Sequence, residues 1–400
     1  MELRVGIVGC GTAGQAAGIL LARQGHEVTV LERTPEIRPI GAGLLVQPTG
    51  LGVLRRLGVA DELLGLGTKV DRLFGTTDRG RVVLDISYTD LRHDLFGLGV
   101  QRAALTAVLM RELTAHAIEP ILGVQIESAD PDVGTLFSAD GRSFGPFDLV
   151  IAADGARSGL RATVPSLVRR DRPYAWGALW FIGSDSERRY GAELRQIYRG
   201  TRRMLGFLPS GKAAPDAPAS VSLFWSCRTS EWARAASFDL VGWKNEVRAL
   251  TDLADPLLDQ INDPSQVVFA PYRDAILSRP HHRRLVFLGD AAHAMSPQLG
   301  QGVNLALLDA AALVDAIEDA ESLEQALRDF RLIRRRNIAF YQSASRWLTP
   351  LFQSGISPLA IPRDLLMASL CRFPWTRRQA LLSLAGVKTG MLSASPIPVG

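Results

Sequence analysis

The chain has 400 residues, of which 47% are hydrophobic and 22% are charged, and its formal net charge is +4. This composition is that of a globular protein with a substantial core, and the length suggests two or more domains or one large α/β body. The positive charge is almost all arginine, and the arginine doublets are scattered without interleaved aromatic residues, which argues against a nucleic-acid-binding surface.

Cysteine and histidine spacing excludes two further classes. Cys10, Cys227 and Cys371 lie far apart and form no C-x-x-C pair, which indicates a reducing compartment, so we expect a cytoplasmic protein. The six histidines show no metal-ligand spacing, and no metal site is expected. The uncharged stretch 5–22 resembles a membrane segment, but its five glycines disfavour a continuous helix, so no transmembrane segment is expected.

The first predicted unit is a strand, a glycine turn, a helix and a second strand. Residues 3–8 and 26–31 are the strands, 15–24 is the helix, and the turn carries Gly9, Gly11 and Gly14 in the G-x-G-x-x-G register. The second strand ends on Glu32, which can accept hydrogen bonds from a ribose diol. The glycines permit a tight turn, close approach of a pyrophosphate and close helix–strand packing. This unit predicts a dinucleotide site.

After Glu32, a glycine-containing stretch precedes a series of helices and short strands. The glycines of 41–48 predict a loop where the backbone approaches something closely. Later elements are helices at 49–57, 61–66 and 103–117, a hairpin over 71–87 that turns at 78–80, short strands at 121–129, 133–138 and 143–144, and a buried strand at 147–153 that ends on Asp154.

The middle of the chain is rich in β-branched and aromatic residues. Strands are predicted at 175–183, 193–198, 203–208, 219–225 and 267–271, with helical sequence over 238–258. A buried strand at 284–288 ends on Gly289-Asp290, helices follow at 302–319 and 322–341, and 347–384 is an apolar, proline-broken helical tail. The strand at 284–288 must join the sheet that begins at residue 3.

We therefore expect an α/β fold with a Rossmann-like cofactor domain, an inserted β-sheet substrate domain and C-terminal helices. The expected cofactor domain comprises 1–72, 98–172 and 268–345, the substrate domain 73–97 and 173–267, and the helical tail 346–400.

Three predicted strands end in small turns that carry glycine or an acid. They are the N-terminal glycine turn, Asp154-Gly155, and Gly289-Asp290, which is followed by the sequence Pro297-Gln298-Leu299-Gly300-Gln301-Gly302-Val303-Asn304. In open α/β sheets, ligands bind at the carboxyl ends of the strands. Three such ends predict one extended ligand that crosses the sheet edge.

Together, these three motifs resemble those of the single-component (group A) FAD-dependent monooxygenases with the para-hydroxybenzoate hydroxylase fold, over residues 1–340. Salicylate-type aromatic hydroxylases and ubiquinone-pathway hydroxylases are relatives of this family. The resemblance implies that bound FAD is reduced by NADPH or NADH and reacts with O2, and that a flavin C4a-hydroperoxide hydroxylates an aromatic or polycyclic small molecule. No second glycine fingerprint is present, so the reductant is expected to dock transiently.

The resemblance also assigns roles to single residues. It implies that the FAD pyrophosphate is held by Gly9, Gly11, Ala13 and Gly14 and that Glu32 binds the adenosine ribose. Arg33 would lie near the adenine, and Val124 would contact the adenine through its backbone. It places Arg102 near phosphate or ribityl oxygens, Asp290 on the ribityl hydroxyls, Pro297 over the flavin ring, and the backbone N–H groups of Gly300, Gly302, Val303 and Asn304 at the flavin N1–C2=O edge. The Asp154 turn would serve both FAD and the nicotinamide cofactor.

Plainer interpretations remain open for several residues. Asp290 could cap the following segment, Arg102 could be a solvated helix-start residue, and His293 is expected to have a structural role. Tyr198, Phe207 and Trp225 could line the substrate pocket, but a core role is at least as well supported. The apolar tail could seat on a membrane or cover a substrate tunnel, although ordinary packing is expected and membrane contact is not.

Other functions are compatible with the same motifs. A flavin oxidoreductase that inserts no oxygen, such as a prenyl-chain reductase, and a non-catalytic flavin-binding redox sensor are the alternatives. A flavin-dependent halogenase would carry Trp-x-Trp-x-Ile-Pro, whereas residues 179–183 lack the second tryptophan and the proline. The expected partners are O2 and an aromatic or apolar small molecule, and the expected assembly is a monomer or homodimer. Trp176, Trp180 and Trp225 crowd the middle region, which favours a long apolar pocket.

Overall fold

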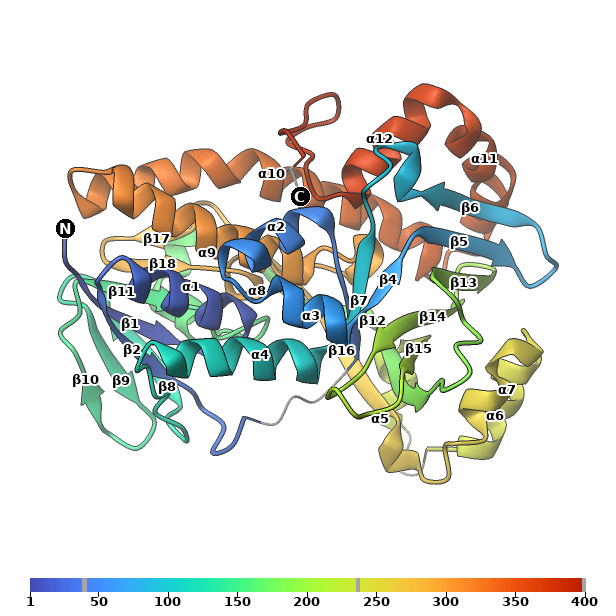
Figure 1. The fold of residues 1–400 in the computed structure, drawn as a ribbon, viewed down its shortest axis with the longest axis horizontal. Coiled ribbons are helices and arrows are strands. Elements are labelled where there is room, and N and C mark those ends of the chain that lie inside the picture. The colour runs from blue at the N-terminus through green and yellow to red at the C-terminus, as the bar shows by residue number, and fades with distance from the viewer. Residues whose placement is uncertain (38–41, 235–237, 398–400) are drawn as a thin grey trace.

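The computed structural model describes residues 1–37, 42–234 and 238–397. Of the predicted loop at 41–48, Gly41 lies outside the described residues. Figure 1 shows a cofactor domain at the N-terminal side of the molecule and a second β-sheet body on the other side, with the C-terminal helices along the top. The mixed α/β fold predicted from the sequence is confirmed.

The cofactor domain is built on a five-stranded sheet of order β17-β18-β11-β1-β2. Its parallel strands are β1 (Arg4–Val8), β2 (Glu27–Leu31), β11 (Leu149–Ala152) and β18 (Leu285–Phe287), and β17 (His281–His282) pairs antiparallel at the edge. Val5 lies opposite Leu149, and Ile151 lies opposite Val286. The predicted strand at 284–288 therefore does join the N-terminal sheet. Such strands are almost wholly apolar because both faces of a parallel sheet are covered.

Helices cover one face of this sheet and a small sheet covers the other. The helices are α1 (Thr12–Arg23), α2 (Pro48–Arg56), α3 (Ala60–Leu66), α4 (Arg102–Ala115), α9 (Gly302–Asp319) and α10 (Leu323–Phe352). Ile7, Leu109 and Leu307 share their core. On the opposite face, β8 (Ile126–Asp130), β9 (Thr135–Ser138) and β10 (Ser143–Phe144) form the predicted meander, and Leu136 packs with Val150.

The second body is a seven-stranded sheet of order β16-β12-β15-β14-β13-β5-β6. Its strands are β5 (Arg72–Thr77), β6 (Val82–Ser87), β12 (Val168–Ser184), β13 (Glu193–Arg199), β14 (Arg203–Gly211), β15 (Ser220–Arg228) and β16 (Val268–Leu277). Two expected domain boundaries differ from this arrangement. Strand β12 begins before residue 173, and β16 pairs with β12 although 268–345 was assigned to the cofactor domain. Strand periodicity does not say which of two sheets a strand joins.

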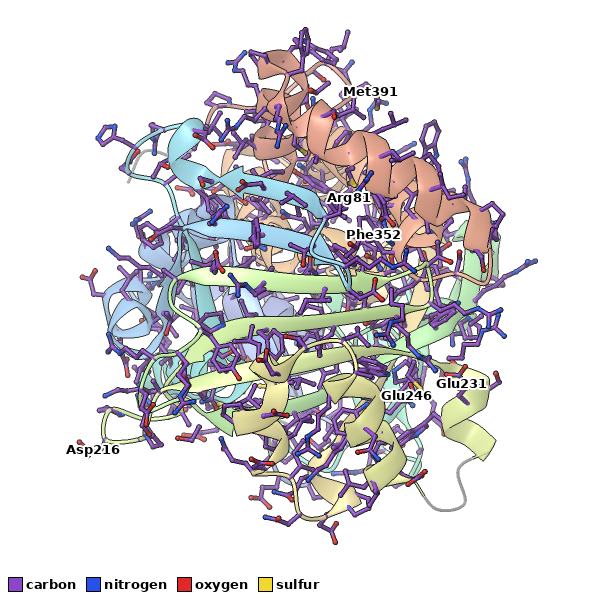
Figure 2. The ribbon with its side chains drawn as sticks, turned by 90° about the vertical axis from the view of Figure 1, so that its right-hand side faces the viewer. Arg81, Asp216, Glu231, Glu246, Phe352 and Met391 are labelled. Carbon is purple, nitrogen blue, oxygen red and sulfur yellow. The ribbon has the colours of Figure 1, made fainter. Side chains whose placement is uncertain are left out.

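Short helices cover the outer face of the large sheet. They are α5 (Thr229–Arg234), α6 (Leu240–Arg248) and α7 (Asp255–Leu258), and Figure 2 shows the last two in front of the sheet face turned away from the cofactor domain. The helical sequence predicted over 238–258 is interrupted, because Thr251 caps a separate 3-10 turn, η4 (Asp252–Ala254). Leu257 and Val247 pack with Phe207 and Trp225 in the outer core.

The inner face of the large sheet meets the cofactor domain. A three-stranded sheet of β3 (Gly43–Val46), β7 (Gly97–Gln101) and β4 (Thr68–Val70) lies at the junction. Gly43 donates its N–H to the Ser222 hydroxyl at 2.8 Å. A Cβ on Gly99 would lie 1.8 Å from the Pro209 carbonyl oxygen, so only glycine allows the two bodies to approach this closely.

The chain ends in helices that pack at one end of the large sheet. Helix α10 continues through Pro350 to Phe352 and is followed by α11 (Ala360–Arg372) and α12 (Pro374–Leu384) above β6 (Figure 1). The remaining short elements are α8 (Asp290–His293) and the 3-10 turns η1 (Tyr88–Asp90), η2 (Leu160–Thr163), η3 (Pro165–Leu167), η5 (Pro264–Gln266), η6 (Pro297–Leu299) and η7 (Ser357–Leu359). Within the described ranges, no helix has the length and hydropathy needed to cross a membrane.

Candidate cofactor and substrate site

Three strand ends meet at one edge of the cofactor sheet. Strands β1, β11 and β18 are adjacent and parallel, so their carboxyl ends lie together. A Cβ built on Gly9 would lie 2.5 Å from the Ala153 carbonyl oxygen, and one built on Gly289 would lie 3.3 Å from the Ala13 Cβ. The three turns singled out in the sequence therefore form one continuous edge, as expected for a single extended ligand.

The glycines of the first turn have distinct surroundings. Gly9 has a φ of +102°, which side chains rarely adopt. A Cβ on Gly14 would lie 2.0 Å from the Gly9 carbonyl oxygen, so Gly14 is needed for the helix to pack onto the turn. A Cβ on Gly11 would meet nothing within 4 Å. The space beside Gly11, at the N-terminus of α1, suits a pyrophosphate that approaches the backbone.

Glu32 is held beside this turn. Its Oε2 accepts from the Cys10 N–H at 2.8 Å, and its Oε1 accepts from the Thr34 N–H at 3.0 Å. The Val124 N–H donates to the Glu32 carbonyl at 2.9 Å. An adenine could therefore be contacted by the Val124 carbonyl but not by its N–H. Arg33 is exposed next to them. These residues lie together beside the glycine turn, and their role at the adenosine end stays a prediction.

The two acidic turns differ in exposure. Asp154 has a buried Oδ1 without a hydrogen-bond partner, and burial raises the pKa of this carboxyl. Asp290 is exposed and is the first residue of α8, whose N-cap is Gly289. No side chain caps α8, so the capping role considered for Asp290 is not observed. The Asp290 Oδ1 lies 3.9 Å from a Cβ built on Gly302, which brings Asp290 next to the start of α9.

The start of α9 offers backbone donors. The first intrahelical bond runs from the Leu305 N–H to the Gln301 carbonyl at 2.9 Å, so the N–H groups of Gly302, Val303 and Asn304 precede the helical ladder. Gly300 has a φ of +60°, which lets the chain turn into the helix. A helix N-terminus stabilises negative charge, as on a reduced flavin at N1.

The Asn304 side chain has a structural role that sequence reasoning missed. Its Oδ1 accepts from the Gln47 N–H at 2.8 Å, and its Nδ2 donates to the carbonyl oxygens of Leu45 and Gly300 at 3.2 and 3.1 Å. This side chain therefore ties β3 and the start of α2 to the Gly300 turn. Only the backbone N–H of Asn304 is left for a cofactor.

Gln47 is a candidate site residue that was not predicted. The Tyr88 hydroxyl donates to the Gln47 Oε1 at 2.6 Å, which directs the Nε2 amide the other way. That Nε2 is buried without a partner and lies 4.0 Å from a Cβ built on Gly300. A buried donor with no acceptor is costly, so its position beside the Gly300 turn points to a cofactor oxygen or nitrogen. The only sequence signal was its position in the glycine-containing stretch before Pro48.

His293 belongs to a buried ionic network. Its Nε2 lies 2.6 Å from the Asp309 Oδ2, and the Arg334 Nε donates to the Asp309 Oδ1 at 2.7 Å. The Gly289 N–H also donates to the Asp309 Oδ2 at 2.9 Å. The network joins α8, α9 and α10 directly behind the Gly289-Asp290 turn. It supports the structural role expected for His293.

Strand alternation decides where the three candidate substrate residues lie. Ser222 and Ser220 on β15 bond to cofactor-domain groups, so even-numbered residues of this strand face inward. Trp225 and its neighbour Phe207 on β14 face the opposite way, into the outer core under α6 and α7. Tyr198 is buried on the inner side, where it packs against Phe352 and donates to the Gln196 Oε1 at 2.7 Å. All three fill cores, and a substrate role for any of them stays a prediction.

A polar bridge connects the Pro297 turn to the large sheet. The Gln298 Nε2 donates to the Gln353 Oε1 at 2.7 Å, and the Gln353 Nε2 donates to the Gly177 carbonyl on β12 at 3.3 Å. The turn is therefore linked to β12 three residues before Trp180, whose ring centroid lies 5.1 Å from that of Phe224. Arg102 is exposed at the first position of α4, a placement that is compatible with both of its possible roles.

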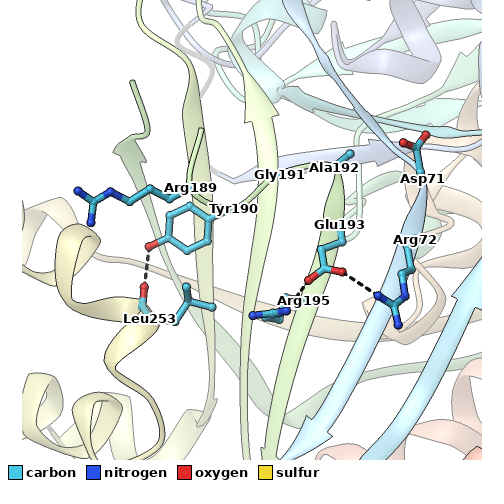
Figure 3. Close-up of a pocket in the computed structure, with 9 residues that line it drawn as sticks. All are labelled: Asp71, Arg72, Arg189, Tyr190, Gly191, Ala192, Glu193, Arg195 and Leu253. Atoms are coloured by element: carbon cyan, nitrogen blue, oxygen red, sulfur yellow. Dashed lines mark hydrogen bonds and ion pairs between the residues drawn. The ribbon is translucent and has the colours of Figure 1, made fainter. Parts of the chain in front are cut away.

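A separate cavity opens on the outer side of the large sheet. Figure 3 shows it between β5, β13 and the 189–192 turn, with a volume of about 360 Å³. Glu193 pairs with Arg195 at 2.7 Å and with Arg72 at 3.5 Å, and the Tyr190 hydroxyl donates to the Leu253 carbonyl at 2.8 Å. None of the residues predicted to bind the cofactor lines it.

The residues at the sheet edge fit FAD. The open space beside Gly11 suits the pyrophosphate, the anchored Glu32 suits the ribose, and the exposed Asp290 with the free N–H groups of α9 suits the flavin half. The unpartnered Gln47 Nε2 lies at the same end. These groups follow one line across the ends of β2, β1, β11 and β18.

Comparison with known proteins points the same way. A family model described as an FAD binding domain matches residues 2–327. The chain is 29% identical over 389 residues to 3-amino-4-hydroxybenzoate 2-monooxygenase of Streptomyces cremeus. The match covers 91% of this chain and 91% of that relative. It is 28% identical over 351 residues to 2-heptyl-3-hydroxy-4(1H)-quinolone synthase of Mycobacteroides abscessus, covering 85% of this chain and 88% of that relative.

Solved structures share the fold. A 2-methyl-3-hydroxypyridine-5-carboxylic acid oxygenase matches with a TM-score of 0.74 at 23% identity, covering 91% of this chain and 96% of its own. PqsL of Pseudomonas aeruginosa, in complex with 2-aminobenzoylacetate, matches with a TM-score of 0.76 at 24% identity. The match covers 90% of this chain and 99% of the PqsL chain. At these identities the likeness establishes the fold alone.

Proposed function

We propose that this chain, which belongs to the FAD-binding-domain family, hydroxylates an uncharged aromatic or polycyclic small molecule with O2 and NAD(P)H. The chain is a flavoprotein oxidoreductase, and its cofactor is FAD. The balanced reaction takes one O2, one NAD(P)H and one proton. It leaves one oxygen atom on the substrate ring, releases the other as water, and forms NAD(P)⁺ as the third product.

The continuous edge formed by the three strand ends carries this proposal. FAD bound there would supply the redox chemistry between NAD(P)H and O2. The chain's own residues bind and orient it. We propose Gly9, Gly11, Ala13 and Gly14 for the pyrophosphate, Glu32, Arg33 and Val124 for the adenosine, Arg102, Asp154 and Asp290 for the middle, and Pro297, Gly300, Gly302, Val303 and Asn304 for the flavin ring.

The inner face of the large sheet supports an uncharged substrate. On β14 the inward residues are Met204, Gly206, Leu208 and Ser210, and on β15 they are Ser220, Ser222, Phe224 and Ser226, none of which is charged. The hydroxyls of Ser220, Ser222 and Ser226 are already hydrogen-bonded to protein groups. Beyond Ser226, the Arg228 guanidinium lies over the Trp176 ring. A neutral wall with the Trp180–Phe224 pair favours an apolar aromatic ring over an aromatic carboxylate.

The test is oxygen insertion by the purified holoenzyme. A panel of neutral bicyclic heteroaromatics and phenols is compared with benzoates for stimulation of NADH and NADPH oxidation and of O2 uptake. We expect stimulation by the neutral compounds and one atom of isotopic oxygen in the product. Product formation without O2 would instead support the reductase alternative. No pyridine-nucleotide oxidation with any compound would support the redox sensor.

Location and assembly belong to the same proposal. The three cysteines are free and buried, which supports a reducing cytoplasmic location. We propose a monomer or homodimer, which light scattering of the purified protein measures directly.

A further inference from the structure

Helix α11 has its apolar face turned outward. Ile361, Leu365, Leu366 and Leu370 are 62%, 52%, 56% and 53% exposed, and their spacing places them on one side of the helix. Arg363, on the same helix, is only 3% exposed. Surface helices of globular proteins normally show the reverse arrangement, with the apolar stripe facing the core.

Buried polar contacts fix this orientation. Arg363 donates to the carbonyl oxygens of Gly200 and Leu351 at 2.9 and 2.8 Å and to the Asp364 Oδ1 at 2.8 Å. Its guanidinium also lies 5.0 Å from the centroid of the Tyr198 ring. Rolling the helix to hide its leucines would expose or unpair this buried cation, so the apolar face stays outward.

The corner between α11 and α12 continues the exposed apolar surface. Phe373 and Trp375 are 62% and 53% exposed, and Arg372 and Arg378 beside them are exposed as well. We call these six apolar side chains the α11 face: Ile361, Leu365, Leu366, Leu370, Phe373 and Trp375. Figures 1 and 2 show α11 and α12 at one end of the molecule, away from the cofactor sheet, so the face is open to a partner. Exposed apolar side chains gathered on one helix and the corner after it are typical of an interaction site.

Charge in this region identifies the partner. Residues 346–400 contain six arginine or lysine residues and one acid, Asp364, which is paired with Arg363. Four of these cations are paired or buried, namely Arg346, Arg363, Arg377 and Lys388. The exposed charge beside the apolar side chains is that of Arg372 and Arg378. An isologous contact with a second copy would bring two such regions together, which like charge disfavours. An anionic surface is the complementary partner.

We propose that the α11 face docks on an anionic lipid bilayer, with α11 lying in the plane of the membrane surface. Leucine, isoleucine, phenylalanine and tryptophan would enter the headgroup–acyl boundary, and Arg372 and Arg378 would contact anionic headgroups. The helix is 13 residues long, which is too short to span a bilayer. Docking departs from the expectation that the tail only packs on the body, although α12 does pack there through Leu381 and Leu384.

Vesicle flotation of the FAD-loaded protein tests the proposal without any substrate, so its outcome is independent of the proposed reaction. Vesicles of phosphatidylcholine alone are compared with vesicles that also contain phosphatidylglycerol. We expect binding to the anionic vesicles to be tighter by about tenfold or more, because each arginine near the surface is worth about fivefold, and to weaken with salt. The fluorescence of Trp375 should shift to the blue on binding, and Trp375→Phe should remove that shift.

Two matched variants assign the surface. Leu366→Glu should abolish flotation, whereas Val241→Glu, at a position 70% exposed on α6, should leave it unchanged. FAD content and thermal midpoint confirm that both variants are folded, and Arg378→Glu provides a second, electrostatic change that should weaken binding about tenfold or more. The proposal is overturned by flotation that ignores Leu366→Glu, by no binding to either vesicle, or by a dimer in solution that Leu366→Glu dissociates.

Discussion

The Nε2 of His293 lies 2.6 Å from the Oδ2 of Asp309, and both side chains are at least 98% buried. The same carboxylate accepts from Arg334 and from the N–H of Gly289. One acid on α9 therefore holds the turn that presents Asp290 to the cofactor edge. The network connects folding stability to the geometry of the site.

Asp309→Asn should be strongly destabilising. Removing one partner of a buried ion pair leaves the other charges uncompensated, which costs about 3–5 kcal/mol. The loss should appear as a lower midpoint of guanidinium unfolding followed by circular dichroism. Glu324→Gln is the matched control, because its ion pair with Arg328 is exposed and should contribute almost nothing. Equal midpoints for the two variants would contradict a structural role for the network.

The contribution of Asp309 should also depend on pH. Burial by itself would raise the pKa of this carboxyl, but the charges of His293 and Arg334 outweigh it and hold the pKa below its ordinary value. A group with a lowered folded-state pKa stabilises the fold above its unfolded pKa of about 4 and loses that contribution as pH falls towards the folded value. The stability gap between wild type and Asp309→Asn should therefore narrow as the pH falls below about pH 4. A stability gap that widens as the pH falls below about pH 4 would contradict a lowered pKa of Asp309 in the folded state.

Gly11→Ala and Gly14→Ala should separate cofactor binding from folding. The Cβ added at Gly11 meets no protein atom within 4 Å, whereas the one at Gly14 would overlap the Gly9 carbonyl. Gly11→Ala should therefore weaken FAD binding by tenfold or more, an estimate based on ~1.4 kcal/mol per factor of ten, and leave the melting of the apoprotein unchanged. Gly14→Ala should lower both the affinity for FAD and the melting temperature of the apoprotein. Titration of apoprotein with FAD, followed by flavin fluorescence, gives the affinities.

Gln47→Leu should weaken FAD binding. If the unpartnered Nε2 donates to the cofactor, losing that bond costs about 1 kcal/mol, or roughly fivefold in affinity. Tyr88→Phe keeps the amide but removes the bond that orients it, so we expect a smaller effect of the same sign. The flavin absorption spectrum should change in both variants. Unaltered affinity and spectrum in Gln47→Leu would show that this amide does not face the cofactor.

The native protein should resist thiol reagents at pH 8. Burial, with a further contribution from the charge of Glu32, raises the pKa of Cys10 to about 12, and burial raises the pKa of Cys227 to about 11. Cys371 is buried and its pKa is also raised. Because the thiolate is the reactive form, a disulfide reagent should titrate almost no thiol before unfolding and three afterwards. Rapid labelling of the folded protein would contradict these environments.

Most of the cofactor edge could be predicted from the sequence, because its signals are local. The βαβ unit at the N-terminus and the turns at Asp154 and Asp290 each carry their own strand and glycine pattern, and parallel pairing brings their carboxyl ends together. The side-chain roles were harder to predict. Gln47 shows no pattern of its own, and the orphaned state of its Nε2 depends on Tyr88, 41 residues away.

The sequence by itself determined the dinucleotide turn, the order of the elements and the α/β fold, because periodicity and glycine spacing act over a few residues. Only the tertiary structure decided that β16 joins the large sheet, that Phe207 and Trp225 face outward under α6 and α7, and that α11 turns its leucines to the surface. Alternation along a strand or helix distinguishes two faces. What covers each face depends on chain segments far away in sequence, and for α11 on the buried contacts of Arg363.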